Sequence, residues 1–331
     1  MQAIVFSAAN QVVLDTLAEP RAGPGEVVLE VRASGICHTD YEVLKANYGS
    51  SAFPVVPGHE YAGVVVEVGE GVNSIATGER VVVDPNIECG RCRACQRGWA
   101  HLCERLGAYG VTDNGGFAQF SVVKASAVHP IGQMSFSQAA LAEPMGCVLN
   151  GIGAVWAPWM EEALIFGAGP MGLLMAIALR TQGLGHVVLC DIAQDRLDLA
   201  AGFGFATLNA GSAGLEDWHH RADLVVEATG VAAVAGRVTD YMANGGKGLY
   251  FGVCPSGARI EVAPFEIFRR QLTLAGTHSL NHNIPQALDT IAACGPDIEG
   301  LVSHHLSLDE VSQILRTGLP EKSMKVQAVL A

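Results

Sequence analysis

The chain has 331 residues, of which half are hydrophobic and 16% are charged. This length and composition predict one large domain or two ordinary ones with a sizeable core. The 33 acidic residues outnumber the 20 basic residues and give a formal net charge of −13. A surface this acidic repels phosphate backbones and anionic lipids, so nucleic acids and membranes are poor candidates as partners.

The N-terminal segment and the longest uncharged run indicate in which cellular compartment the protein is located. The first ten residues, MQAIVFSAAN, lack the basic start and the long apolar stretch of a signal peptide. The longest uncharged run, 163–179, is interrupted by glycine and proline, which argues against a membrane span. We therefore expect a cytoplasmic protein, whose nine cysteines serve metal binding or catalysis and not disulfides.

Residues 1–150 contain short segments that are typical of β-strands separated by turns. Strands are expected over 25–37, 60–72 and 78–85 and within 115–131, each closed by glycine or proline. Such short, punctuated strands predict an antiparallel, barrel-like domain.

Four cysteines lie within CGRCRACQRGWAHLC, namely Cys89, Cys92, Cys95 and Cys103. Their C-x2-C-x2-C-x7-C spacing gathers the thiols in one small volume, and four nearby arginines favour deprotonated sulfurs. The pattern predicts a tetrahedral structural zinc site. An iron–sulfur cluster is the alternative, although ferredoxins close the motif with x3-C-P. A zinc ion with four thiolates has no open position, so the chemistry must lie elsewhere.

After about residue 150, strands alternate with helices. The expected order is a strand, glycine turn, helix and strand over 161–191, a helix over 192–204, a strand over 222–230, a helix over 231–246, and strands over 247–254 and 271–278. This alternation predicts a parallel sheet with helices on both faces. From 279 onward, helices and short strands alternate without a glycine motif.

Gly167, Gly169 and Gly172 form a G-x-G-x-x-G motif between an apolar strand and a helix. These glycines permit a tight turn, close approach of the backbone to a pyrophosphate, and close packing of the helix on the strand. The next strand ends in Asp191, where an acid is expected to bind the adenosine ribose hydroxyls. This acid favours NAD over NADP, and Arg196 weakens the preference.

A second group of metal-ligand residues lies in GICHTD and VPGHEYAG. Cys37 follows a strand and a glycine, and His59 and Glu60 precede another strand. A thiolate, an imidazole and a carboxylate are suited to an open zinc site whose fourth position binds water or substrate.

The chain resembles the zinc-dependent medium-chain alcohol and polyol dehydrogenases, in the branch of sorbitol, threonine and sugar-alcohol dehydrogenases. Gly58-His59-Glu60 with Gly63, Gly69 and Val72 matches the family signature, and the four cysteines and the glycine motif follow in the family's order. The resemblance implies an α/β protein with three parts. A GroES-like β-barrel catalytic domain with the structural-zinc lobe covers 1–148, a Rossmann doubly wound parallel sheet covers 149–277, and 278–331 return to the catalytic domain.

The resemblance also implies the catalytic residues. Cys37 and His59 would bind the catalytic zinc, together with Glu60 or Glu143 as alternative or exchanging ligands. Thr39 would begin the proton relay, because it matches the family's hydroxyl residue.

Further residues are expected to support this site and the cofactor. Asp40 would orient His59, and Glu42 replaces the relay histidine of several family members. Pro170, Met171 and Val253 are expected to contact the dinucleotide together with the glycines.

The implied function is a hydride transfer from a polyol or other secondary alcohol to NAD+, in a homodimer or homotetramer with two zinc ions per chain. L-threonine and phosphorylated sugar alcohols are alternative substrates. Other classes are a zinc-free enone or quinone reductase and a non-catalytic, redox-sensing NAD-binding protein that keeps only the structural zinc.

Overall fold

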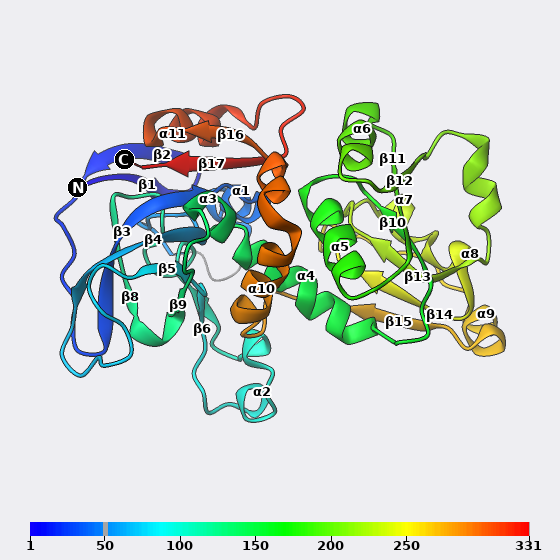
Figure 1. Ribbon diagram of the computed structural model, residues 1–331, viewed down its shortest axis with the longest axis horizontal. Coiled ribbons are helices and arrows are strands. Elements are labelled where there is room, and N and C mark those ends of the chain that lie inside the picture. The colour runs from blue at the N-terminus through cyan, green and yellow to red at the C-terminus, as the bar shows by residue number, and fades with distance from the viewer. Residues whose placement is uncertain (49–51, 331) are drawn as a thin grey trace. The chain divides into compact units, whose positions relative to one another are not determined.

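The computed structural model describes residues 1–48 and 52–330, which divide into two compact units. The discontinuous unit combines Met1–Gly146 with Leu280–Ala331, and the continuous unit is Cys147–Ser279. The chain therefore leaves the first unit, builds the second without interruption and returns (Figure 1).

The discontinuous unit is built mainly of antiparallel strands. They are β1 Gln2–Ala8, β2 Gln11–Thr16, β3 Glu26–Gly35, β4 Glu60–Val68, β5 Arg80–Val83, β6 Asn86–Ile87, β7 Gly107–Ala108, β8 Phe120–Lys124, β9 Val128–Pro130, β16 Val302–Leu306 and β17 Lys325–Val329. Its main sheet has the order β16-β17-β3-β4-β5-β9, and β8 also pairs with β3. The last strand, β17, thus lies beside β3 from the first tenth of the chain (Figure 1).

Short helices connect these strands. They are α1 His38–Leu44, α2 Arg93–Gln96, α3 Phe136–Ala139, α10 Ile284–Cys294 and α11 Leu308–Thr317, with 3-10 turns at Ala100–Leu102, Ala125–Ala127 and Gly295–Leu301. Helix α4, Ala142–Val155, begins in the discontinuous unit and continues into the other.

The core of the discontinuous unit follows the two-residue period of its strands. Val27, Leu29 and Val31 of β3 point to one face and form a buried cluster with Tyr61 and Val65 of β4. This packing fixes the register of β3 against β4, because a slip of one residue would turn these side chains to the other face.

The continuous unit holds a parallel sheet in the order β12-β11-β10-β13-β14-β15. The strands are β10 Glu162–Phe166, β11 His186–Asp191, β12 Ala206–Asn209, β13 Ala222–Glu227, β14 Met242–Tyr250 and β15 Thr273–Gly276. Its helices are α5 Pro170–Thr181, α6 Gln194–Gly202, α7 Ala232–Ala235, α8 Val238–Tyr241 and α9 Pro264–Arg270, with a 3-10 turn at Ala213–Trp218. The order reverses at β10, which makes the sheet doubly wound.

The expected helix over 231–246 is wrong. Two four-residue helices, α7 and α8, take its place, and β14 begins at Met242. Gly245 adopts a left-handed φ of 76°, which a helix interior does not accept, and Met242 pairs with Ala222 of β13. The pairing of the sheet therefore overrides the helical propensity of the alanine-rich sequence.

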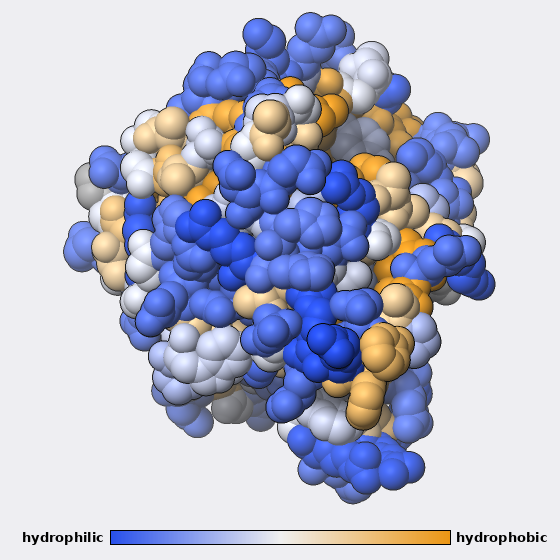
Figure 2. Space-filling model, turned by 90° about the vertical axis from the view of Figure 1, so that its right-hand side faces the viewer, coloured by the Kyte–Doolittle hydropathy of each residue, from blue (hydrophilic) through white to orange (hydrophobic). Residues whose placement is uncertain are grey.

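The face of the molecule in Figure 2 is largely hydrophilic, with small groups of hydrophobic side chains among the polar ones. Among the described residues, no helix combines the length and the apolar character that a bilayer crossing requires.

Candidate active site

Three neighbouring strands bring the candidate ligands to one end of the discontinuous unit's sheet. Glu60, the first residue of β4, pairs with Gly35, the last residue of β3. Gln327 of β17 pairs with Gly35 from the other side. Cys37 lies two residues after the end of β3, and Lys325 begins β17. The register therefore gathers a thiol, two carboxylate oxygens and an ammonium from distant parts of the sequence.

Cys37, His59 and Glu60 form a compact group of possible metal ligands. Their ligand atoms all lie within 4.8 Å of one another. His59 and Glu60 are buried and Cys37 is half-buried. Gly35 leaves room for the Glu60 carboxylate in this position, because a Cβ there would lie 2.3 Å from Glu60 Oε2.

The start of helix α1 fixes Cys37 and His59 through one carboxylate. Asp40 Oδ2 accepts a hydrogen bond from the Cys37 backbone N–H at 2.9 Å, which closes the first turn. Asp40 Oδ1 lies 3.4 Å from His59 Nδ1. Burial alone lowers the pKa of His59, but the charges of Asp40 and Cys37 outweigh it and raise the pKa well above its usual value. Asp40 thus places a carboxylate beside the Nδ1 atom of the imidazole.

Lys325 is a site residue that sequence reasoning missed. Its Nζ donates to both Glu60 oxygens at 2.5 Å, and both side chains are buried. Burial lowers the pKa of Lys325, but the carboxylate of Glu60 and the Cys37 thiol raise it to about 12. The pair is separated by 265 positions, so no local pattern links the two residues.

Glu143 and Thr39 complete the predicted catalytic set. Glu143 is buried in the first turn of α4, and its charge contributes to the raised pKa of Lys325. Glu143 is not one of the three compactly grouped ligands. The Thr39 hydroxyl lies 3.7 Å from Cys37 Sγ.

Glu42, the expected substitute for a relay histidine, is held by other groups. It accepts hydrogen bonds from the Asn47 amide and the Lys45 ammonium, both at 3.2 Å. These bonds lower the pKa of Glu42. A carboxylate whose pKa is lowered is a weak proton acceptor, which makes Glu42 a poor relay.

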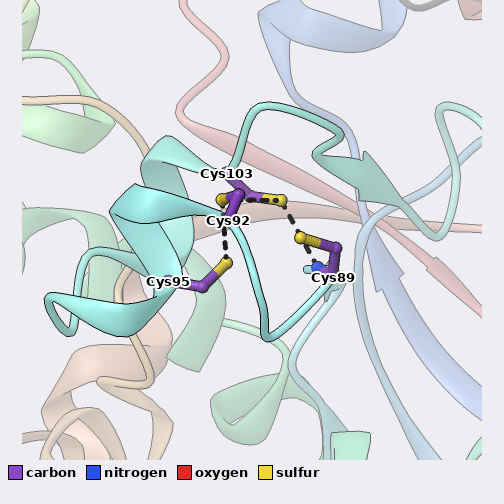
Figure 3. A group of neighbouring side chains, drawn as sticks. All are labelled: Cys89, Cys92, Cys95 and Cys103. Carbon is purple, nitrogen blue, oxygen red and sulfur yellow. Dashed lines mark hydrogen bonds between the residues drawn. The ribbon is translucent and has the colours of Figure 1, made fainter.

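The four clustered cysteines converge around one point (Figure 3). Their ligand atoms lie within 4.8 Å of one another, and Cys92 Sγ is 3.5 Å from Cys95 Sγ and 3.9 Å from Cys103 Sγ. None of the nine cysteines, all of which lie among the described residues, is part of a disulfide. The cluster is therefore a four-thiol site and not a pair of disulfides.

The electrostatics of this cluster favour a cation. Backbone N–H groups of Arg91 and Cys92 lower the pKa of Cys89 to about 6. Burial and the neighbouring thiols raise the pKa of Cys95 to about 12. The Cys89 thiol thus ionises easily, while burial and the neighbouring thiols oppose the ionisation of Cys95. A divalent metal ion removes this obstacle, because it stabilises all four thiolates.

The glycine motif shows the close contacts that its residue types predict. Gly167 has a φ of 104°, and a Cβ on Gly172 would lie 1.8 Å from the Gly167 carbonyl oxygen. Gly169 caps helix α5, and Pro170 and Met171 begin that helix. The helix start and the glycine turn form a typical site for a pyrophosphate.

Asp191 ends β11 and supports the glycine loop. Its Oδ2 accepts from the Ala168 N–H at 2.7 Å, and its Oδ1 accepts from the Ala193 N–H at 2.9 Å. Arg196 Nη1 lies 3.9 Å from Asp191 Oδ2, and its guanidinium is also near Gly169. Val253 follows β14 with 89% of its surface exposed.

A glycine loop for a dinucleotide together with a thiolate, imidazole and carboxylate group defines a metal-dependent oxidoreductase. Comparison with known proteins identifies its family. Residues 23–133 match the alcohol dehydrogenase GroES-like domain, and residues 141–326 match the glucose dehydrogenase C-terminus. The chain belongs to the zinc-type medium-chain alcohol/polyol dehydrogenases, with a GroES-like domain and a Rossmann-like sheet.

Individual relatives agree with this family. D-altritol 5-dehydrogenase of Agrobacterium fabrum is 49% identical and covers 94% of each chain. D-arabinitol dehydrogenase 1 of Uromyces fabae is 32% identical and covers 91% of this chain and 89% of its own. A zinc-binding dehydrogenase of Sinorhizobium meliloti 1021, solved with NADP, is 30% identical, with a TM-score of 0.94 over 99% of both chains. The protein is thus a dehydrogenase that acts on small-molecule alcohols.

Proposed function

We propose that the enzyme oxidises a secondary hydroxyl of a sugar alcohol with a nicotinamide dinucleotide as hydride acceptor. The observation that carries the proposal is the compact group of Cys37, His59 and Glu60 in a chain that is 49% identical to a polyol dehydrogenase. A non-catalytic protein would have no need to keep these three ligands, two of them buried, together.

The donor atoms fit a catalytic zinc ion held by Cys37, His59 and one carboxylate, from Glu60 or Glu143. Cys89, Cys92, Cys95 and Cys103 fit a second, structural zinc, which gives two ions per chain. When bound, the catalytic zinc supplies Lewis acidity that lowers the pKa of an alcohol.

The chain's own residues position the groups around this chemistry. Asp40 would orient the imidazole of His59, which it faces at 3.4 Å, and Lys325 balances the charge of Glu60. The Thr39 hydroxyl, close to Cys37, would accept the proton that the substrate releases and pass it to water. Glu42 takes no part in this relay, since its lowered pKa weakens it as a base.

The dinucleotide would bind along Gly167, Gly169, Pro170, Met171 and Gly172 in the continuous unit. We propose NAD as the preferred form, because the Asp191 carboxylate repels a 2′-phosphate. Arg196 beside Asp191 reduces this repulsion, so NADP is expected to bind more weakly than NAD.

An alcohol panel tests the proposed activity. Formation of NADH is followed with D-altritol, D-arabinitol, L-threonine and a phosphorylated sugar alcohol, and the highest kcat/KM is expected for a sugar alcohol. Cys37→Ser should abolish the activity and halve the zinc content, while the control Cys294→Ser, on helix α10, should retain both. Activity of Cys37→Ser equal to that of the unaltered enzyme on every substrate would overturn the proposal.

A further inference from the structure

Glu227, the last residue of β13, is a fully buried carboxylate that the reaction described above does not use. Its Oε1 accepts hydrogen bonds from the backbone N–H of Thr229 at 2.7 Å and of Gly230 at 2.9 Å, and from the Thr229 hydroxyl. Its Oε2 has no hydrogen-bond partner among the described residues. A buried acceptor without a donor destabilises a protein, so packing alone does not explain a glutamate here.

The backbone of Glu227 holds a second turn. Its carbonyl oxygen accepts from the N–H groups of Phe251 at 2.9 Å and Gly252 at 2.7 Å, where the chain leaves β14. A Cβ on Gly252 would lie 2.6 Å from Glu227 Oε2 and 2.3 Å from the Gly230 nitrogen. The turn 228–231 and the turn 251–254 therefore interlock around this one residue, and only glycine fits at 252.

The two turns lie on one side of the point where the strand order reverses. β13 and β10 are neighbours, and the Gly167 backbone lies against the Ala228 carbonyl group, where a Cβ would be 3.1 Å from the oxygen. In a doubly wound sheet the ligand lies at this reversal, outside the carboxyl ends of the strands, and each half of the sheet binds one nucleotide. Asp191 belongs to the β11 half, so the interlocked turns belong to the half for the other nucleotide.

We propose that Glu227 is a positioning residue for the nicotinamide half of the dinucleotide. Its side chain fixes the turn 228–231 and its carbonyl fixes the turn 251–254, from which the exposed Val253 projects. The Val253 backbone packs closely against Gly230, because a Cβ on Gly230 would lie 2.7 Å from the Val253 oxygen. This inference rests on the proposed dinucleotide-dependent function and adds to it a residue that reaches the ligand only through its neighbours.

Binding titrations of the zinc-loaded protein with NADH and with AMP test the inference. Glu227→Ala should raise the Kd for NADH at least tenfold, since the turn 228–231 loses its side-chain anchor while the backbone carbonyl of residue 227 is kept, and it should leave the Kd for AMP within twofold. Glu227→Gln should stay within threefold for both ligands, because the amide oxygen still accepts the three bonds at the Oε1 position. The selective loss and its rescue by glutamine are results that a merely structural role would not give.

Asp223→Asn is the matched control. Asp223 accepts hydrogen bonds from the backbone N–H groups of Glu161 and Glu162, at the opposite end of the same strand. It should leave both affinities unchanged. If Glu227→Ala does not fold, Thr229→Ala replaces it as the test variant. Its affinity for NADH should fall threefold to tenfold, and its affinity for AMP should stay the same. A lower melting temperature with an unchanged NADH affinity, or equal losses for NADH and AMP, would overturn the inference. Failure of the unaltered protein to bind either nucleotide would reject the dinucleotide function itself.

Discussion

The buried pair of Lys325 and Glu60 joins stability to function at the scale of single residues. Both side chains are at most 5% exposed, and the Lys325 ammonium donates to both oxygens of Glu60. Two buried charges are tolerable only while they neutralise each other. Lys325 therefore also limits how freely Glu60 can turn towards a metal ion.

Lys325→Met should leave the buried Glu60 carboxylate without its counter-ion. We expect the free energy of unfolding to fall by about 3–5 kcal/mol, the usual cost of removing one member of a buried ion pair. Urea denaturation followed by fluorescence measures the change. The double variant Lys325→Met/Glu60→Gln, which leaves no charge behind, should recover at least half of the loss. Equal stability of the single and double variants would contradict this account.

Asp84 follows β5 and carries a pH dependence of its own. Burial raises the pKa of Asp84 from its usual 3.8 to about 6, although the backbone N–H of Asn86 and the charge of His282 oppose the shift. The folded state therefore keeps a proton that the unfolded state has already released between about pH 4 and 6. The stabilising contribution is complete below pH 4 and is lost as the pH rises through 6.

Asp84→Asn should remove this dependence, because the amide has no charge to bury. Two pKa units correspond to about 3 kcal/mol, so the variant should be up to ~3 kcal/mol more stable than the unaltered protein at pH 7.5. The difference should vanish below pH 4. Thermal unfolding at a series of pH values measures it, and a constant difference at every pH would show that Asp84 does not titrate as described.

The cysteine lobe, residues 88–106 between β6 and β7, contains only short pieces of regular secondary structure. Its helix α2 has four residues, none of them buried. Asn281 joins the lobe to the rest of the discontinuous unit, because it accepts from the Ala100 N–H at 3.1 Å and donates to the Gly98 carbonyl at 2.8 Å. We expect the metal to supply the stability that packing does not.

Cys103→Ser should reduce the zinc content from two ions to one per chain, as measured by elemental analysis, and should unfold the lobe locally. Hydrogen exchange across 89–105 should become faster by at least tenfold, while β10 to β13 keep their protection. Cys190→Ser, which removes a buried thiol in the continuous unit, is the control and should keep both ions. Unchanged exchange in the lobe of Cys103→Ser would contradict a structural role for the metal.

The elements that were predictable from the sequence are those whose signals are local. The glycine turn, α5 and β11 follow from spacing and apolar runs, because their contacts join residues a few positions apart. The roles of Lys325 and Glu227 were not predictable, since each depends on strands that meet only in the folded sheet. The same cause explains the wrong helix over 231–246, where pairing of Met242 with Ala222 overrides an alanine-rich segment.

At the scale of the whole molecule, we propose a homodimer or homotetramer. Phe265 and Phe268 on α9 are 65% and 81% exposed, and β15 is an outer strand of its sheet. An exposed pair of aromatic rings close to an open sheet edge suits a second copy of the chain.

Phe268→Asp should weaken this association, because it places a charge in an apolar contact. Sedimentation at micromolar concentration should show a shift towards a monomer of 34.6 kDa. Val329→Asp, at an apolar position of β17 that is 45% exposed, is the control and should leave the mass unchanged. A monomeric unaltered protein would contradict the proposed assembly.

Because the discontinuous unit is made of two separate segments of the chain, its parts are synthesised at different times. Glu60 leaves the ribosome 265 residues before Lys325, which at 5–20 residues per second is a delay of roughly 13–53 s. Throughout that interval the edge of β3 that β17 will cover is unpaired and the Glu60 carboxylate lacks its counter-ion. The continuous unit, by contrast, emerges whole and is free to fold first. The nascent chain can therefore complete its cofactor sheet before the final strand closes the sheet that carries the metal ligands.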